Sequence, residues 1–115
     1  MFNFFAPVDE NNYDDIMTEI KDGKAQLIDI REYNEWTSNR FECAVNVPLS
    51  GLSRGIGIEK LAAFENDNKK VYLHCHTGSR VQMAQRMLPA FGLNNFSIIP
   101  ISMMEMSRKG FNLVA

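Results

Sequence analysis

Short apolar runs alternate with stretches of helical periodicity along this chain, and that alternation restricts the fold more than any other feature. The runs 25–30, 44–47, 70–74 and 96–99 have the length and hydrophobicity of buried strands. Apolar residues recur at helical spacing in 13–20, 58–64, 81–88 and 103–109. Strand–helix–strand connections are parallel crossovers, so we expect a three-layer α/β/α domain with a mostly parallel central sheet of about five strands, the first near Phe4.

The size and charge of the chain limit its partners. With 115 residues, 45% of them hydrophobic and 23% charged, residues 1–115 are predicted to form a single domain around one core. The net charge of -2 gives no clustered excess of Lys and Arg for binding nucleic acid. No apolar run approaches the roughly 20 residues of a membrane span, and the first residues lack the basic region of a secretory signal. We therefore expect a cytoplasmic protein without a membrane partner.

Tryptophan, proline and a Gly/Ser-rich stretch mark the irregular parts of the expected fold. Trp36 is expected to anchor a short helix in the core. Residues 49–57 follow Pro48 and are expected to form a mobile loop. Pro89 would clash with the carbonyl of Gln85, so the helix that contains it should be kinked or shortened.

The functional site of a parallel α/β sheet lies at the carboxyl ends of its strands. The polar segments 29–32, 48–57 and 75–80 follow strands and are expected at that edge. Cys43 precedes its strand, which places it at the opposite end in a structural role. A bond between Cys43 and Cys75 would require the two ends of the sheet to meet, and two cysteines are too few for a disulfide framework.

Cys75 leaves a buried strand and enters a short loop that leads into a helix. Free N–H groups and the macrodipole at a helix N-terminus favour negative charge, and hence the nucleophilic thiolate. Gly78 can adopt backbone angles closed to other residues, so the loop can curl its N–H groups inward around the sulfur. The loop residues predicted to bind substrate are His76, Thr77, Gly78 and Ser79. The alternative for Cys75 is a buried, inert thiol.

Two arginines are candidates for holding an anion near Cys75. Arg80 is predicted to be catalytic, because its planar fork can hold an oxyanion or close over the loop and fix its shape. Arg54, in the segment after Pro48, could bind an anionic donor, with a solvated surface charge as the alternative.

The other polar residues at this edge have structural interpretations. Asp29 and Arg31 are expected to form an ion pair that braces neighbouring loops. Glu32 and Glu35 are typical of a solvated helix face. His74 and His76 flank the cysteine but lack a third firm ligand, so no metal site is predicted.

Three motifs occur in order over nearly the whole chain: Leu27-Ile28-Asp29-Ile30-Arg31-Glu32 through Trp36, Ala44-Val45-Asn46-Val47-Pro48, and Cys75-x-x-Gly78-x-Arg80. In this order they resemble the signature blocks of single-domain rhodanese-like sulfurtransferases. The resemblance implies a rhodanese-like α/β/α domain with thiosulfate sulfurtransferase activity. In the implied reaction the Cys75 thiolate takes the outer sulfur of a donor such as thiosulfate, becomes a persulfide, and passes the sulfur to a thiol or cyanide.

The implied partners are a small anionic sulfur donor and, as acceptor, a thiol or a thioredoxin-like protein. No metal or organic cofactor is required. The resemblance does not identify the physiological donor and acceptor.

Val81 stands where the family commonly has a serine, which removes a hydroxyl that could hydrogen-bond the loop. Clustered methionines replace the usual Gly-Gly and Trp near the C-terminus; adaptable core filler is the expected role, and a hydrophobic rim for an acceptor protein is the alternative.

Two other functions stay open. The segment from His74 to Arg80 also resembles the His-Cys-x-x-Gly-x-x-Arg loop of cysteine phosphatases, but it is one residue short. Its tighter ring suits a single sulfur atom better than a tetrahedral phosphoryl group, which disfavours a phosphatase or an arsenate reductase. A non-catalytic rhodanese-like binding module is the other alternative, because a fold alone does not settle function.

Overall fold

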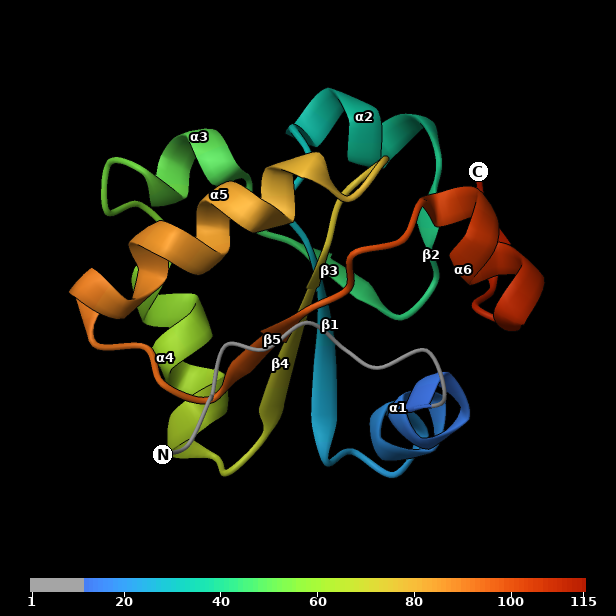
Figure 1. Ribbon diagram of the computed structural model, residues 1–115, viewed down its shortest axis with the longest axis horizontal. Helices are drawn as coiled ribbons and strands as arrows, with labels where there is room; N and C mark the ends of the chain where they lie inside the picture. Colours follow the sequence, from blue (N-terminus) through green and yellow to red (C-terminus); the bar gives the residue numbers. More distant parts are fainter. Residues whose placement is uncertain (1–11) are drawn as a thin grey trace.

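The computed structural model describes residues 12–115, and four parallel strands form its central sheet (Figure 1). Their order is β3-β1-β4-β5, and each neighbouring pair is parallel. The predicted α/β fold with a mostly parallel sheet is confirmed, with four strands in the described part; the strand predicted near Phe4 lies outside it. The strands are β1 (Ala25–Asp29), β3 (Ala44–Asn46), β4 (Lys70–His74) and β5 (Phe96–Ile98).

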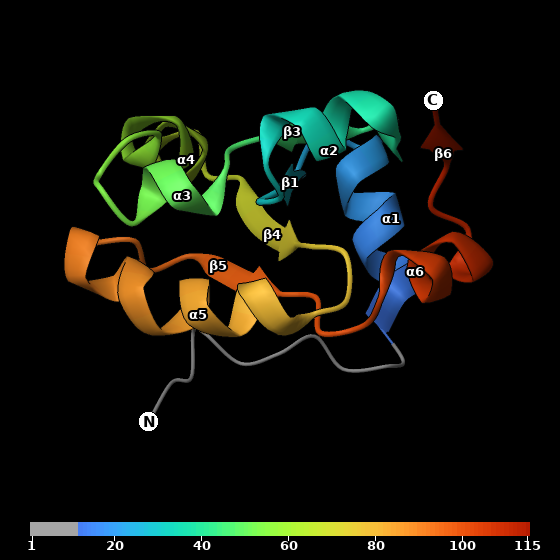
Figure 2. The same ribbon diagram turned by 90° about the horizontal axis from the view of Figure 1, so that it is seen from above.

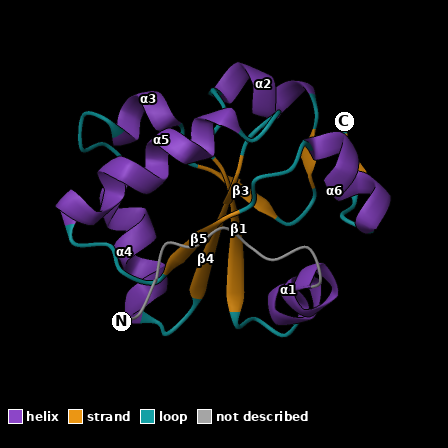
Figure 3. Ribbon diagram, viewed as in Figure 1, coloured by secondary structure: helices purple, strands orange, loops and turns teal. Residues whose placement is uncertain are grey.

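Helices cover both faces of this sheet. Helices α1 (Tyr13–Lys21) and α6 (Met103–Lys109) lie on one side, and α3 (Leu49–Leu52), α4 (Ile58–Asn66) and α5 (Ser79–Met87) lie on the other (Figures 2 and 3). No helix among residues 12–115 is both long and apolar enough to cross a membrane.

The strand period of two sends successive side chains to opposite cores. Leu27 and Tyr72 pack in the core beneath α1 and α6. Ile28, Leu73 and Cys75 belong to the core beneath α3, α4 and α5. Cys75 is therefore continuous with the second core, whereas its neighbour His74 packs against Phe41 on the other side of the sheet.

Pro89 ends helix α5, as the sequence predicts. The α-helix stops at Met87 and continues as a 3₁₀ turn, Leu88–Phe91, with the proline near its start. At that position the missing N–H and the fixed φ of proline cost little.

Two local predictions are wrong. The Gly/Ser-rich stretch is not a loop throughout, because its first residues form α3 and bury Leu49 and Leu52. Trp36 does not anchor a helix in the core. Helix α2 (Tyr33–Ser38) has no buried residue, and the tryptophan is partly buried beneath the guanidinium of Arg40, 4.7 Å from its ring centroid.

A second, two-stranded sheet was not expected. Strands β2 (Arg40–Phe41) and β6 (Leu113–Val114) pair antiparallel beside α6. Strands of two residues carry no readable periodicity, so the sequence could not predict them. Their pairing holds Phe41, which is fully buried, against the His74 ring at a centroid distance of 5.1 Å.

The central strand β4 should dominate the stability of the fold. Leu73 is fully buried between β1 and β5, so Leu73→Ala is expected to lower the free energy of unfolding by about 3 kcal/mol through lost burial and a cavity. Urea unfolding measures the change. The control is Met104→Ala, because Met104 is 64% exposed and its truncation should cost less than about 0.5 kcal/mol. Equal losses of unfolding free energy in the two variants would contradict the dominant contribution of β4 to stability.

Candidate functional site

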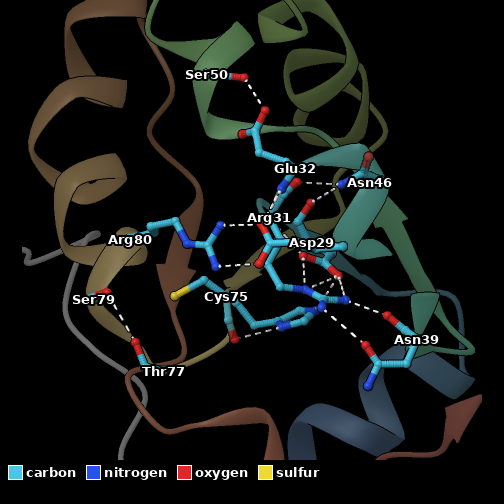
Figure 4. Close-up of polar contacts among 12 residues, drawn as sticks. Asp29, Arg31, Glu32, Asn39, Asn46, Ser50, Cys75, Thr77, Ser79 and Arg80 are labelled. Atoms are coloured by element: carbon cyan, nitrogen blue, oxygen red, sulfur yellow. Dashed lines mark hydrogen bonds and ion pairs between the residues drawn. The ribbon is translucent and has the colours of Figure 1, made fainter. Parts of the chain in front are cut away.

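The polar residues that follow the central strands meet at the carboxyl edge of the sheet, at the top of Figure 1. Figure 4 shows that Asp29 and Arg31 from the end of β1, Asn46 from β3, and Cys75 and Arg80 from the β4–α5 junction lie in this region. Asp29 and Asn46 are register partners, as are Asp29 and His74.

Cys75 is a free thiol with no exposed surface. Its Sγ accepts a hydrogen bond from the backbone N–H of Gly78 at 3.2 Å. Within residues 12–115 this is the one donor to the sulfur, whereas the sequence predicted several inward amides from His76 to Arg80. The loop therefore offers the sulfur a single fixed amide at the start of α5.

Gly78 is required by its backbone and by its neighbours. Its φ is +97°, in the left-handed region that L side chains rarely adopt. A Cβ atom there would clash with the carbonyl oxygen of Pro100. The loop is also tied to α6, because Met103 N–H donates to the His76 carbonyl at 3.0 Å. The close approach of these two segments fixes the amide that faces the sulfur.

The remaining loop side chains face solvent. His76, Thr77 and Ser79 are exposed, and the two hydroxyls lie 3.1 Å apart. They form the exposed rim of the loop that holds the buried sulfur.

Arg80 forms a two-point ion pair with Glu35 from α2. Its Nη1 and Nη2 lie 2.6 and 3.0 Å from the two carboxylate oxygens. The hydrogen bonds from Arg80 lower the pKa of Glu35 from 4.5 to about 2, against the opposing effect of partial burial. The same contact raises the pKa of Arg80. Of the two roles considered for Arg80, the structure shows closure between the loop and α2.

Glu35 was expected on a solvated helix face, and that expectation is wrong. Besides binding Arg80, its Oε1 accepts the backbone N–H of Glu32 at 3.0 Å in a capping box. Glu32 in turn accepts a hydrogen bond from the Ser50 hydroxyl at 2.7 Å. The signal that could have indicated this role is its position in the first turn of the helix that follows β1, directly above the strand ends.

Asp29 and Arg31 form a buried ion pair beside the cysteine. The carboxylate accepts three contacts from the Arg31 side chain, at 2.8 to 3.1 Å, and a fourth from its backbone N–H at 2.9 Å. Arg31 also donates to the Asn39 carbonyl at 2.6 Å. The Asn46 amide donates to the carbonyls of Asp29 and Arg31. These contacts join β1, β3 and the segment after α2.

His74 lies beneath Cys75 on the opposite face of the sheet. Its Nδ1 is 3.3 Å from the Cys75 carbonyl oxygen, while its Nε2 has no hydrogen-bond partner among the described residues and stands 3.7 Å from Asp29 Oδ2. Burial lowers the pKa of His74 from 6.5 to about 4, outweighing the attraction of the Asp29 charge. The imidazole is therefore neutral at physiological pH.

Arg54 and Cys43 lie away from the Cys75 sulfur. Arg54 is exposed, and its neighbour Gly55 lies beside Phe91, beyond the far end of α5. Among the described residues, no polar contact joins Arg54 to the Cys75 loop. Cys43 is exposed just before β3, at the opposite end of the sheet from Cys75.

The chemistry available here is that of a nucleophilic sulfur with a fixed amide donor. The amide stabilises negative charge on the sulfur or on an atom attached to it. The carboxylates of Asp29 and Glu35 are bound to arginines, and the His74 side chain is fully buried on the opposite face of the sheet. Among the described residues, no group of three His, Cys, Asp or Glu side chains could hold a metal ion.

The chain is similar to known proteins over most of its length. The family model of the rhodanese-like domain matches residues 12–109. A putative sulfur carrier protein, YrkF of Bacillus subtilis, is 29% identical over 80 residues, and the match spans 69% of this chain but only 40% of that protein. The mitochondrial thiosulfate sulfurtransferase RDL2 of Saccharomyces cerevisiae is 24% identical over 102 residues, covering 82% of this chain and 68% of the relative.

Solved structures share the fold. The rhodanese-related protein of Thermoplasma volcanium has a TM-score of 0.70 and 24% identity, and the match covers 96% of this chain and 98% of that one. The yeast RDL2 crystal structure has a TM-score of 0.62 and 22% identity, with coverage of 85% and 87%.

The close approach at Gly78 leads to a prediction about stability. Gly78→Ala is expected to cost about 3 kcal/mol, because it combines a left-handed backbone with the clash against Pro100. Gly92→Ala is the matched control: Gly92 also has a positive φ, +82°, but nothing lies within 4 Å of its Cβ position, and the cost should be about 1 kcal/mol. Urea unfolding of both variants gives the comparison. A loss at Gly78 no larger than at Gly92 would rule out the clash.

The buried imidazole predicts a pH dependence of stability. Between about pH 6.5 and 4 the unfolded chain binds a proton at His74 that the folded chain does not. The fold should therefore lose up to about 3 kcal/mol as the pH falls through that window. His74→Leu removes this titration together with the unpartnered nitrogen, so the stability of the variant should fall less between pH 7 and 4.5. Urea unfolding at the two pH values tests this, and parallel losses in variant and wild type would contradict it.

Proposed function

Because the chain belongs to the rhodanese-like domain family, we propose that it is a sulfurtransferase that carries sulfane sulfur as a persulfide on Cys75. The donor is a compound such as thiosulfate, and the acceptor is a thiol or cyanide. The observation that carries the proposal is the Gly78 N–H held 3.2 Å from the Cys75 sulfur at the start of α5. The names of two relatives, a putative sulfur carrier and a thiosulfate sulfurtransferase, support it.

In the first step the Cys75 thiolate attacks the outer sulfur of the donor. A bond forms between Sγ and that sulfur, the sulfur–sulfur bond of the donor breaks, and its electron pair leaves with sulfite when thiosulfate is the donor. The Gly78 amide stabilises the thiolate before attack. Because the sulfur is buried, the exposed rim residues His76, Thr77 and Ser79 must admit the donor.

In the second step an acceptor nucleophile attacks the terminal sulfur of the persulfide. A bond forms between the acceptor and that sulfur, and the Cys75 thiolate is released with the electron pair. Neither step moves a proton through a general base, which fits an edge where Asp29 and Glu35 are bound to arginines. A thiol or a thioredoxin-like protein is the proposed cellular acceptor.

The loop favours this reaction over phosphate transfer. Four residues separate Cys75 from Arg80, and the Arg80 fork is turned to Glu35. A phosphatase loop needs an arginine that grips the phosphoryl oxygens. In sulfur transfer the attacking and released charge lies on the Cys75 sulfur, which the Gly78 amide faces, and not on oxygens that an arginine has to grip.

Cys75→Ser should abolish sulfur loading. Wild-type protein incubated with excess thiosulfate is expected to gain one sulfur atom by intact mass spectrometry, and cyanide should remove it as thiocyanate. The serine variant should gain none, because it lacks the accepting sulfur. Cys43→Ser, at the exposed second cysteine, should load as wild type does.

Loading that survives in Cys75→Ser but disappears in Cys43→Ser would show that the chemistry belongs to the other cysteine. A wild-type protein that takes sulfur from neither thiosulfate nor a persulfide would favour a non-catalytic binding module. Hydrolysis of an aryl phosphate in its place would favour the phosphatase.

A further inference from the structure

Arg80, at the end of the loop that begins with Cys75, is already bound to another side chain. Both terminal nitrogens of its guanidinium are bonded to Glu35, and the two side chains are 32% and 34% exposed. The charge of Arg80 acts on Cys75, but a carboxylate of opposite sign stands at the same place. The pair therefore presents little net charge to an incoming donor.

No second cation in the described part of the chain compensates for this pairing. Arg31 is buried and bound to Asp29, and Arg54 lies beyond the far end of α5. Among residues 12–115, no other Arg or Lys makes a polar contact with the loop 75–80. What remains for a donor is uncharged: the backbone amides at the start of α5, of which the one of Gly78 is directed at sulfur.

The common sulfur donors differ in how much charge they bring to this place. Thiosulfate is a dianion whose sulfonate oxygens carry charge that the protein must offset. A persulfide, R–S–S⁻, carries one charge, and that charge lies on the atom being transferred. The thiolate and thiosulfate bring together three negative charges, whereas the thiolate and a persulfide bring two. In a site shielded from water the additional repulsion is costly.

We infer that Glu35 sets the donor specificity of this protein, and that by neutralising Arg80 it favours a persulfide of a thiol over thiosulfate. The inference rests on the proposed function and narrows its donor. Glu35 acts through Arg80 and does not touch the reacting atoms. The ion pair stabilises the conformation of the loop. Because both terminal nitrogens of Arg80 are bonded to Glu35, the guanidinium is not available to a sulfonate.

The favoured step is balanced without any further reactant. The Cys75 thiolate attacks the outer sulfur of R–S–S⁻, a bond forms between Sγ and that sulfur, and the bond between the two donor sulfurs breaks. The products are the Cys75 persulfide anion and the thiolate R–S⁻, so two negative charges stand on each side. No electron is gained or lost overall.

The test compares two donors in wild type and Glu35→Gln. The persulfide of 2-mercaptoethanol, whose organic group is uncharged, and thiosulfate are supplied separately with cyanide as the common acceptor, and thiocyanate formation above the protein-free blank gives kcat/KM. The assay is run at low ionic strength and at about pH 8.5, where an ordinary histidine is neutral. Wild type should prefer the persulfide. Freeing Arg80 should raise the ratio of thiosulfate to persulfide efficiency by about tenfold, the value of one charge-assisted hydrogen bond.

Glu65→Gln is the matched control. Glu65 accepts two backbone N–H groups, from Asn94 and Asn95, and no arginine contact is found for it among the described residues. The substitution removes the same unit of charge away from the Cys75 loop, so the donor ratio should stay at the wild-type value. Glu35→Gln keeps an oxygen that can accept the Glu32 amide, which limits the change in α2.

A double-mutant comparison tests whether Glu35 acts through Arg80. In the Arg80→Gln background, adding Glu35→Gln should leave the donor ratio unchanged, because there is no cation to release. The gain in Glu35→Gln alone should shrink at about 0.5 M salt, where the charge of the freed guanidinium is screened.

Each outcome bears on a different statement. Turnover with neither donor overturns the proposed function. If the wild-type kcat/KM for thiosulfate equals that for the persulfide, the inferred donor specificity is wrong, whatever the variants show. If the ratio of thiosulfate to persulfide efficiency is unchanged in Glu35→Gln, or changes equally in Glu65→Gln, Glu35 does not set the donor specificity.

Discussion

The buried ion pair of Asp29 and Arg31 is the contact on which the functional edge depends. It holds the end of β1 to the Asn39 carbonyl and, through Asn46, to β3. A buried pair of this kind is not a large net source of stability, but losing one partner leaves an uncompensated charge in the core. Its value is positional, since it fixes the segment from which α2 rises and hence the place of Glu35.

Opposite charges are paired across this edge. The inner pair, Asp29 with Arg31, is sealed from water, and the outer pair, Glu35 with Arg80, is about one third exposed. The group that faces the Cys75 sulfur is an uncharged backbone amide, that of Gly78. An edge arranged in this way stabilises charge on a single atom, which is what the proposed persulfide on Cys75 would need.

Much of the fold was predictable because it depends on local pattern. The short apolar runs of β1 and β4, the helical spacing after Cys75 and the proline near the end of α5 each leave a signal in a few residues. The expectations failed where burial was decided by distant partners. A Gly/Ser-rich stretch forms α3 because Leu49 and Leu52 are buried in the core. Trp36, on α2, is only partly buried, beneath Arg40.

The sequence by itself determined that Cys75 leaves a strand and enters a glycine-containing loop before a helix, because strand, turn and helix signals are local. Only the tertiary structure decided what surrounds the sulfur. Glu35 is 45 positions from Arg80, and Pro100 approaches Gly78 from after β5. Neither contact leaves a periodic trace, since residues far apart in sequence meet only when parallel strands bring their carboxyl ends together.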